Sequence, residues 1–491
     1  MPKLFVKNFI NIREAEIDMD KTLVVFIGAT ASGKSILAKL LYFFHELIRD
    51  FRQYIKQINA YPPEHLKSDL PDLSTVFRAQ ISYKFREFFG DASELALITD
   101  NDDTIKPFEI IYHWTTDSRI TLTLDAEKTL EIQLPTVMDE IETLCYGLQE
   151  KLRQFDKKQH VGKVSNPDSA ADPPTKADVS SADSTQESKT SERFFFILKM
   201  AIGIGDITEK LAGTYRDSLF IPADRNIAVN YPDALKRIFY GGIKSDLHTR
   251  AATRPRVNLH LIARFLEKNE EFLDTFSTQN FHNIFDEKAE AESDSIDKPM
   301  IEFLLKKISC ILKSEYETIG EISESRLFSH PTGENAAFLE RASTGQQNVI
   351  RILQDMFMNV LYNEVIFRVI EEPEAHLHPI AQKHLMHIIA LMRNHIDSQI
   401  VITTHSPYLL AVLKNLLTAG QLSKKELEAV TEIEALTPKL CWLNPDDVEV
   451  YHLKDGMSHA IVQPEAEPVL ENPLAELLLE FGGRTPSRDT R

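Results

Sequence analysis

Cysteine is scarce in this chain of 491 residues, with only Cys145, Cys310 and Cys441, and these lie far apart in the sequence. Their spacing excludes a disulfide framework and a CxxC metal pair, and it is typical of a protein in a reducing compartment. Long apolar runs are missing too, because none reaches the roughly 18 residues that a bilayer-spanning helix needs. Residues 1–5 have the pattern of a strand and not of a signal peptide. We therefore expect a cytoplasmic protein without a membrane partner.

Positive charge is in deficit. Lys and Arg number 55 against 74 Asp and Glu, so the net charge is −19. A surface this acidic argues against sequence-independent coating of nucleic acid, which needs a basic face, although a local basic groove remains open. Apolar residues make up 43% of the chain, enough to form large cores. At about 100–200 residues per domain, the length predicts roughly two to four domain-sized units.

Large apolar side chains nearly disappear between residues 156 and 192. This segment holds only Val161, Val164 and Val179 among mostly Ser, Asp, Lys, Thr, Ala, Pro and Gln. Such a composition cannot bury enough surface to offset the entropy lost on ordering. It predicts a disordered linker, and a tether that binds a partner or is regulated is the alternative.

Apolar periodicity predicts the remaining elements. The expected strands are 4–9, 15–19, 23–27, 109–114, 119–124, 129–134, 219–221, 317–323, 337–340, 365–370 and 400–403. The expected helices are 36–48, 137–155, one that starts at Ser343, and a mainly helical stretch over 231–312 with a polar break near 290–298.

The segment of residues 28–35, named here the phosphate loop, fits G-x-x-x-x-G-K-S between a buried strand and a helix. Its members are Gly28, Ala29, Thr30, Ala31, Ser32, Gly33, Lys34 and Ser35. Backbone N–H groups of such a loop point at phosphate oxygens, and the helix N-terminus adds positive charge. Lys34 is expected to reach the β- and γ-phosphates of ATP, and Ser35 to bind Mg²⁺. Ala31 stands where many such loops have glycine, which tightens the loop without abolishing binding.

Two carboxylates follow the apolar run 365–370. Glu371 and Glu372 open an acidic loop, residues 371–374, at the carboxyl end of an expected parallel strand, where ligands bind in open α/β sheets. We assign Glu371 to the metal and Glu372 to the attacking water. An acidic loop that merely ends a strand is the alternative, and the nearby phosphate loop disfavours it.

Histidines follow the carboxylates. His376 and His378 form an H-x-H pair that could bind metal, but no third ligand at suitable spacing is evident, so we favour a loop beside the nucleotide. His405 ends the next β-branched run, 400–403, where a histidine can donate a hydrogen bond to the γ-phosphate and report hydrolysis. A core or turn histidine is the alternative.

The signature segment, residues 343–347, opens an amphipathic helix. Ser343 is a good N-cap. Ser343, Thr344, Gly345 and Gln346 equally suit a second anion site, because a hydroxyl, a glycine N–H and a helix N-terminus all face one ligand. The sequence alone leaves these two interpretations open.

Together these motifs resemble the ATP-binding cassette (ABC) ATPases of the SMC/RecF branch, and within it the OLD (overcoming lysogenization defect) family. The matching pieces run in order: Asn8-Phe9, G-A-T-A-S-G-K-S, S-T-G-Q-Q, I-E-E-P-E-A-H-L-H-P, T-T-H-S-P and, more weakly, residues 446–451 with 455–456. The resemblance implies an α/β fold, in which an ABC-type P-loop ATPase head has a mixed sheet core, an antiparallel β subdomain and a helical insertion.

The resemblance also implies a head-to-tail homodimer, with ATP and Mg²⁺ between the phosphate loop of one chain and the signature segment of the other. Each motif occurs once, so two complete sites need two chains. Larger assemblies stay open. The expected division is 1–135 and 316–465 for the two parts of the head, 136–155 for a helix, 156–192 for the linker, 193–315 for the insertion and 466–491 for a tail.

The chain also departs from its relatives. The signature is S-T-G-Q-Q and not L-S-G-G-Q, and Glu371 replaces the usual Asp, which both favour the OLD-like branch. The glutamine that senses Mg²⁺ cannot be identified, and Gln80 is a weak candidate. Long heptad arms are missing. About 85 residues follow Ser406, too few for the Toprim nuclease domain of OLD nucleases.

These departures favour one function over several others. The chain resembles the ATPase subunits of two-component antiviral defence systems such as Septu and PARIS, which control a separate effector nuclease. A RecF-like repair ATPase that clamps DNA is the main alternative, so nucleic acid stays open as a partner. A stand-alone nuclease and a transporter ATPase are disfavoured, since no nuclease motif is visible.

Overall fold

The computed structural model describes most of the chain. The described residues are 2–60, 72–98, 105–125, 127–144, 147, 205–206, 208–213, 216–226, 257–292, 296–319, 324–329, 336–425, 433–434 and 437–461. The predicted linker 156–192, the tail 466–491 and the start of the predicted helical stretch, 231–256, lie outside these ranges. Among the described residues, no helix is long and apolar enough to cross a membrane.

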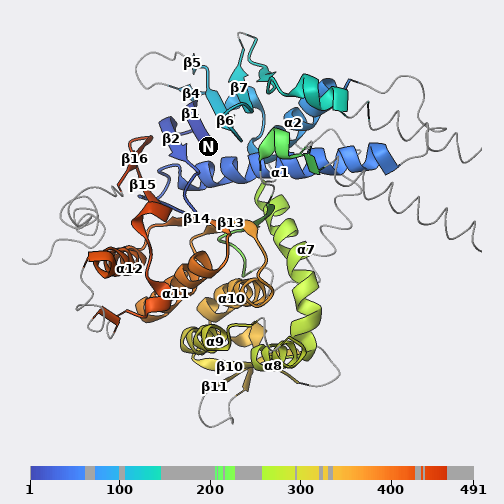
Figure 1. The fold of residues 1–491 in the computed structure, drawn as a ribbon. Helices are drawn as coiled ribbons and strands as arrows, with labels where there is room; N and C mark the ends of the chain where they lie inside the picture. The colour runs from blue at the N-terminus through green and yellow to red at the C-terminus, as the bar shows by residue number, and fades with distance from the viewer. Residues whose placement is uncertain are drawn as a thin grey trace, which may run out of the picture.

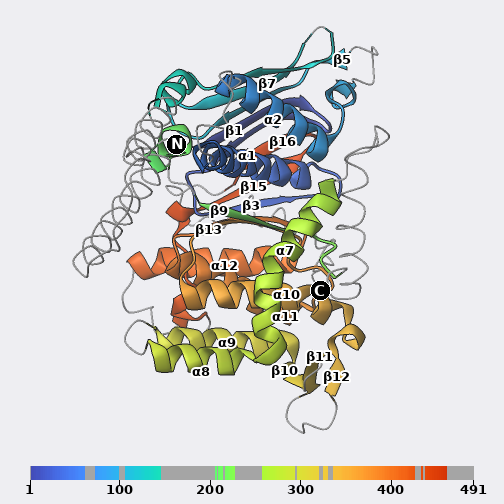
Figure 2. The same cartoon turned by 90° about the vertical axis from the view of Figure 1, so that its right-hand side faces the viewer.

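A large mixed sheet organises the molecule (Figures 1 and 2). Its strands in spatial order are β8 (Leu130–Gln133), β7 (Arg119–Leu124), β6 (Glu109–His113), β1 (Lys3–Phe9), β2 (Ile12–Asp18), β16 (Met457–Ala460), β15 (Val448–Lys454), β3 (Leu23–Gly28), β14 (Gln399–Thr404), β13 (Ile366–Glu371) and β9 (Asp217–Ile221). Strands from β15 to β9 run parallel, and those from β8 to β2 run antiparallel.

The parallel half is buried on both faces, which explains why its strands read as continuous apolar runs. Alternate side chains of β3 enter different cores: Leu23, Val25 and Ile27 face one, and Val24 and Phe26 face the other. Helices cover both sides. On one side lie α1 (Lys34–Ala60) and α2 (Leu73–Phe89), and on the other lie α10 (Thr344–Tyr362), α11 (Pro379–His395) and α12 (Pro407–Lys425) (Figure 2).

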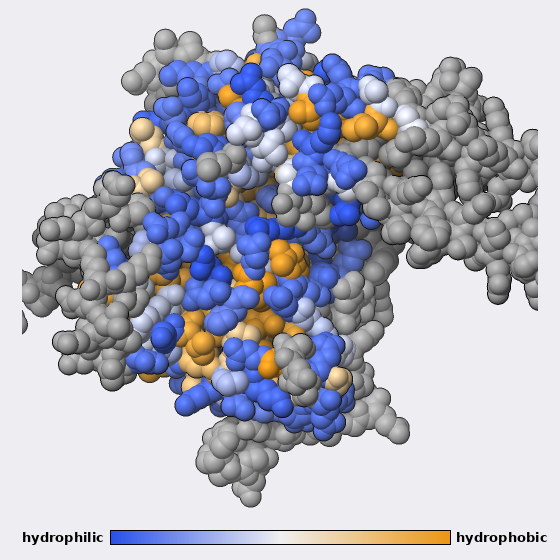
Figure 3. All heavy atoms as spheres, in the orientation of Figure 1, coloured by the Kyte–Doolittle hydropathy of each residue, from blue (hydrophilic) through white to orange (hydrophobic). Residues whose placement is uncertain are grey.

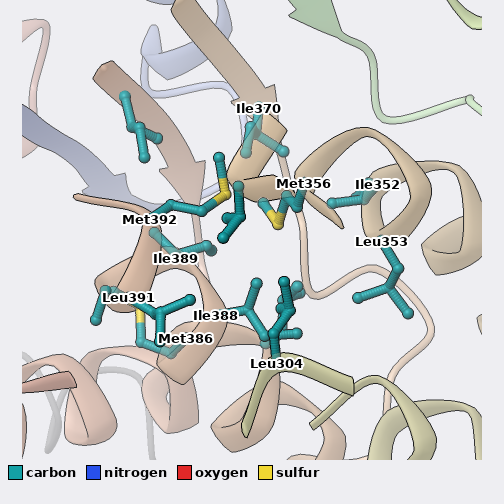
Figure 4. Close-up of a cluster of buried hydrophobic side chains, with 14 of the residues drawn as sticks. Leu304, Ile352, Leu353, Met356, Ile370, Met386, Ile388, Ile389, Leu391 and Met392 are labelled. Atoms are coloured by element: carbon teal, nitrogen blue, oxygen red, sulfur yellow. The ribbon is translucent and has the colours of Figure 1, made fainter. Parts of the chain in front are cut away.

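A further helical layer covers α10 and α11. It consists of α7 (Val257–Thr278), α8 (Phe281–Ala291) and α9 (Lys298–Leu312), and α7 reaches back toward the sheet at β9 (Figure 1). Side chains such as Leu304 of α9, Met356 of α10, Ile388 of α11 and Ile370 of β13 meet in one apolar cluster (Figure 4). Outside this core the face in Figure 3 is mostly hydrophilic, with hydrophobic side chains gathered over the α9–α11 layer.

Two small sheets complete the fold. One contains β10 (Ser314–Ile319), β11 (Glu324–Ser329) and β12 (Ala336–Phe338), and the other pairs β4 (Leu97–Ile98) with β5 (Ile105–Lys106). The strand expected over 317–323 agrees with β10 at residues 317–319, residues 320–323 lie outside the described ranges, and the antiparallel strand β11 was not predicted.

The segment 193–315, expected to be a mainly helical insertion, contains a strand as well as helices in its described part. It supplies β9, which pairs with β13 and forms the edge of the large sheet, as well as α7, α8 and α9. The predicted helix 36–48 is also too short, since α1 extends to Ala60, and α2 had no counterpart in the prediction. Of the predicted helix 137–155, the described residues 138–144 are helical.

A close contact between α12 and the chain before β15 gives a test of the packing. A Cβ atom added at Gly420 would lie 2.0 Å from the Leu443 carbonyl oxygen, so side chains are excluded there. Gly420→Ala is therefore expected to destabilise the protein by about 1–3 kcal/mol through overpacking. Chemical denaturation measures this, with Asn415→Ala on an exposed position of α12 as the control. Equal midpoints for both variants would contradict the contact.

Candidate functional site

Four parallel strands bring the motifs to one edge of the sheet. The phosphate loop follows β3, the acidic loop ends β13, the switch segment of residues 404–406 ends β14, and residues 222–225 follow β9. Because these strands are neighbours in the order β3, β14, β13 and β9, their carboxyl ends place the four segments side by side. Segments as far apart along the chain as Gly28 and Ser406 therefore lie close together in the fold.

Backbone geometry explains the glycines of the phosphate loop. Gly28 has φ 149°, and a Cβ there would lie 2.5 Å from the Leu453 carbonyl oxygen of β15. Gly33 has φ 104°, which L side chains rarely adopt. Ala31 has φ 63°, so a non-glycine residue occupies the left-handed region here. The side-chain amide of Asn11 donates a hydrogen bond to the Ala31 carbonyl and holds this turn.

Lys34 bridges the phosphate loop and the carboxylates. Its Nζ donates to the carbonyl oxygens of Gly28 at 2.9 Å and Ala29 at 2.8 Å, and the residue is only 6% exposed. Burial lowers the pKa of Lys34, while the charges of Glu372 and Glu374 oppose that shift. The ammonium group thus lies within electrostatic reach of two carboxylates at the start of α1, where the helix N-terminus adds positive potential.

Glu371 and Ser35 meet at the edge. The Ser35 hydroxyl and the Ala223 backbone N–H both hydrogen-bond to the Glu371 carboxylate. Burial raises the pKa of Glu371, and the charge of Lys39 opposes this most. A hydroxyl oxygen and a carboxylate oxygen in contact form the type of donor set that Mg²⁺ prefers. The residues predicted to bind the metal therefore fit it.

Glu372 lies beside His405. The His405 Nδ1 is 3.3 Å from the Glu372 Oε1, and both side chains are partly exposed. Glu372 has φ 42°, and its backbone N–H donates to the Thr403 carbonyl at 3.0 Å. The acidic loop thus leaves its strand through a strained left-handed residue while it stays attached to β14. Two residues that the sequence placed at the reaction centre are brought together.

Sequence reasoning did not assign a function to Glu374. Its Oε1 accepts hydrogen bonds from the Thr404 hydroxyl and, at 3.2 Å, from the His405 backbone N–H. Its Oε2 is buried and has no hydrogen-bond partner in the structure. Burial raises the pKa of Glu374. This residue ties the acidic loop to the switch segment, and the only sequence signal for it was its place in I-E-E-P-E.

Arg225 was missed as well. It lies in the turn after β9, is 1% exposed, and directs its guanidinium at the back of the acidic loop. Burial lowers the pKa of Arg225 to about 10, and the charges of Glu374, Glu371, Glu372 and Asp224 oppose that shift. A buried arginine is rare. Nothing in the sequence around Arg225 indicates which groups its guanidinium contacts.

The signature segment forms a helix cap. The Gln346 N–H donates to the Ser343 Oγ at 3.3 Å, and the Ser343 N–H donates to the Gln346 Oε1 at 3.1 Å, which is a capping box. The Gln346 amide also donates to the Leu312 carbonyl at 2.7 Å. A Cβ at Gly345 would lie 2.5 Å from the His376 carbonyl oxygen, so α10 starts directly against the chain beyond the acidic loop.

The two histidines of the H-x-H pair belong to the turn and the N-cap before α11. The His378 Nδ1 accepts from the Ile380 N–H at 3.3 Å and caps α11, and His376 has φ 61° in the turn before it. Within the described part of the chain, no group of three or more His, Cys, Asp or Glu side chains could hold a metal ion. Gln80 lies in α2, on the α1 side of the sheet, and not among the four edge segments.

The family described as "AAA ATPase domain" matches residues 1–410, and the chain belongs to this family. The protein is an ATP-hydrolysing enzyme with an ABC-type P-loop ATPase fold. No curated protein matches the chain in sequence.

Three solved structures with low similarity are heads of SMC proteins. An SMC head bound to the C-winged helix domain of ScpA is 12% identical, with a TM-score of 0.39, and the match covers 94% of this chain and 96% of that one. A head with an extended coiled coil, bound to the C-terminal domain of ScpA and derived from Pyrococcus furiosus, is 14% identical, with a TM-score of 0.36, and covers 94% and 96%. The head from Thermotoga maritima is 9% identical, with a TM-score of 0.34, and covers 94% and 98%.

The raised pKa of Glu374 predicts a pH effect. A carboxyl whose folded pKa is raised stabilises the fold below its unfolded pKa, and this contribution is lost as pH rises through the folded pKa. Gln at this position keeps an acceptor for Thr404 and His405 but does not titrate. The free energy of unfolding of Glu374→Gln, minus that of wild type, is thus expected to increase from acid to neutral pH. Parallel stability curves from urea titrations at several pH values would contradict this.

Proposed function

We propose that ATP binds at this sheet edge, with the phosphate loop around its phosphates. The N–H groups of Gly28, Ala29, Thr30, Ala31, Ser32, Gly33, Lys34 and Ser35 and the start of α1 supply the anion site. Lys34 then exchanges its two loop carbonyls for phosphate oxygens. What supports this most is the meeting of Lys34, Ser35, Glu371, Glu372 and His405 at the ends of three neighbouring strands.

Ser35 and Glu371 hold Mg²⁺ in this proposal. Mg²⁺, when bound, neutralises charge on the phosphate oxygens. Glu372 orients the attacking water and accepts its proton, and His405 contacts the γ-phosphate. The Glu372–His405 contact supports this division, because it joins a base to a hydrogen-bond donor at one point.

The proposed second half of the site comes from another copy of the chain. Helices α1 and α10 cover opposite faces of the sheet, since their apolar side chains belong to different cores. One chain cannot easily wrap both helix N-termini around one nucleotide. A head-to-tail homodimer would present the signature segment, Ser343, Thr344, Gly345 and Gln346, to the partner's ATP. The capping box uses the N–H of Gln346 and leaves those of Thr344 and Gly345 for the phosphate.

We further propose that ATP occupancy of this dimer controls a separate effector protein, a nuclease in antiviral defence. The motif set of the OLD-like type and the net charge of −19 support a protein partner over a nucleic-acid partner. A cytoplasmic location and larger assemblies of dimers belong to the same proposal. The second candidate is a RecF-like repair ATPase that clamps DNA between ATP-bound heads, and the ABC-type fold favours it equally.

The carboxylate roles can be tested by Glu372→Gln. This variant is expected to bind ATP and to hydrolyse it about 100-fold or more slowly, because the amide cannot accept the proton. Lys34→Ala is expected to lose both binding and hydrolysis. Nucleotide binding by calorimetry and phosphate release measure the two effects separately. Hydrolysis by Glu372→Gln at the wild-type rate would refute the assignment of Glu372.

The partner proposal is tested with the same variants. Tagged Glu372→Gln is purified with ATP from its native host, and the eluate is analysed by mass spectrometry and nucleic-acid staining. A stoichiometric nuclease that is absent with Lys34→Ala is the expected result. Bound DNA without a protein partner would instead support the repair clamp, and its binding should then weaken steeply with salt.

A further inference from the structure

Arg225 makes an unusual set of contacts for a buried arginine, because its five hydrogen bonds all go to backbone carbonyl oxygens. The acceptors are Asn348 at 2.8 Å from Nε, Pro222 at 3.0 Å and Glu371 at 2.9 Å from one terminal nitrogen, and Glu372 at 3.0 Å and Pro373 at 3.3 Å from the other. A guanidinium carries five N–H donors in a fixed planar fork. The contacts match that number.

These acceptors belong to three separate elements. Pro222 lies in the turn after β9, Asn348 lies in the second turn of α10, and the other three carbonyls belong to the acidic loop. Arg225 therefore joins the helix of the signature segment to the loop that carries both proposed catalytic carboxylates. Gly345 lies against the His376 carbonyl and adds a second contact between α10 and the same stretch of chain.

The acidic loop needs such support. Glu372 has φ 42°, a left-handed conformation that non-glycine residues adopt at a cost and only when their surroundings fix them. Glu371, Glu372 and Glu374 also repel one another near the edge, and the buried positive charge of Arg225 opposes that repulsion. Guanidinium bonds on three consecutive carbonyls determine the direction of the loop more strictly than one contact would.

We propose that Arg225 is a positioning residue. It links the position of Glu372 to the position of the first two turns of α10. The proposal rests on the roles proposed above for Glu372 and for the signature segment. It extends them, because it makes the catalytic loop of one chain sensitive to how that chain's own signature helix is placed. Arg225 affects hydrolysis indirectly in this proposal, because it holds the backbone that carries Glu372.

A second buried arginine offers a matched control. Arg368 in β13 pairs with Asp355 in α10, with Nε 2.8 Å from Oδ2. It joins β13 to α10, and its guanidinium donates to the side chains of Asp355 and Asn359 and not to a carbonyl of the acidic loop. The double variant Arg368→Met with Asp355→Leu removes that pair without leaving a lone buried charge.

The experiment compares Arg225→Lys, the Arg368→Met/Asp355→Leu control and Glu372→Gln for kcat, ATP affinity and thermal stability. Lysine keeps the charge but not the planar fork. Arg225→Lys is expected to lower kcat by about 10- to 100-fold through misplacement of Glu372, with ATP affinity nearly unchanged. The control is expected to keep kcat. If Arg225→Lys does not fold, Arg225→Gln takes its place.

Two results would overturn the inference. One is a folded Arg225 variant with wild-type kcat, and the other is an equal loss of kcat in the control, which would mean that any loosening of α10 suffices. Wild-type hydrolysis by Glu372→Gln would instead refute the proposed function itself. The failure of the inference and the failure of the proposed function are therefore distinguishable in one set of measurements.

Discussion

The alignment of four parallel strands is the constraint on which the site depends. Strands β3, β14, β13 and β9 are hydrogen-bonded neighbours, and their register brings four distant segments of the chain to one edge. Their two-sided burial supplies the stability that lets loops at that edge adopt costly conformations. Left-handed residues at Ala31 and Glu372 occur where the sheet and its flanking helices fix the backbone on both sides.

Electrostatics gives that edge its chemical character. Two buried cations, Lys34 and Arg225, lie among three carboxylates, and burial shifts the pKa values of Lys34 and Arg225 down and those of Glu371 and Glu374 up. Each charged form is therefore partly destabilised by burial and partly restored by its neighbours. Such a balance responds to added negative charge and to a cation, which is what an ATP-binding site requires.

The sequence predicted the fold class, and it also located the segments that meet at the sheet edge. The phosphate loop, the acidic loop and His405 could be found because short motifs fix their spacing, and the parallel strands because they are continuously apolar. Arg225 could not be found, since four of its five partners are backbone carbonyls of residues more than a hundred positions away, and carbonyls have no sequence signal. The start of β10 and all of β11 were not predicted, because short polar strands differ little from a loop, and α2 was not predicted either.

The position of β15 beside β3 has a consequence for folding during synthesis. The strand before the phosphate loop has both of its sheet neighbours, β14 and β15, in the last quarter of the described chain. At synthesis rates of about 5–20 residues per second, the roughly 370 residues between β3 and β14 take about 20–75 s to emerge. During that interval the apolar strand β3 has neither of its neighbouring strands. Until they emerge, only α1 or a chaperone can cover its apolar side chains. The rate of synthesis therefore sets the earliest time at which β3 can pair with β14 and β15 in the sheet.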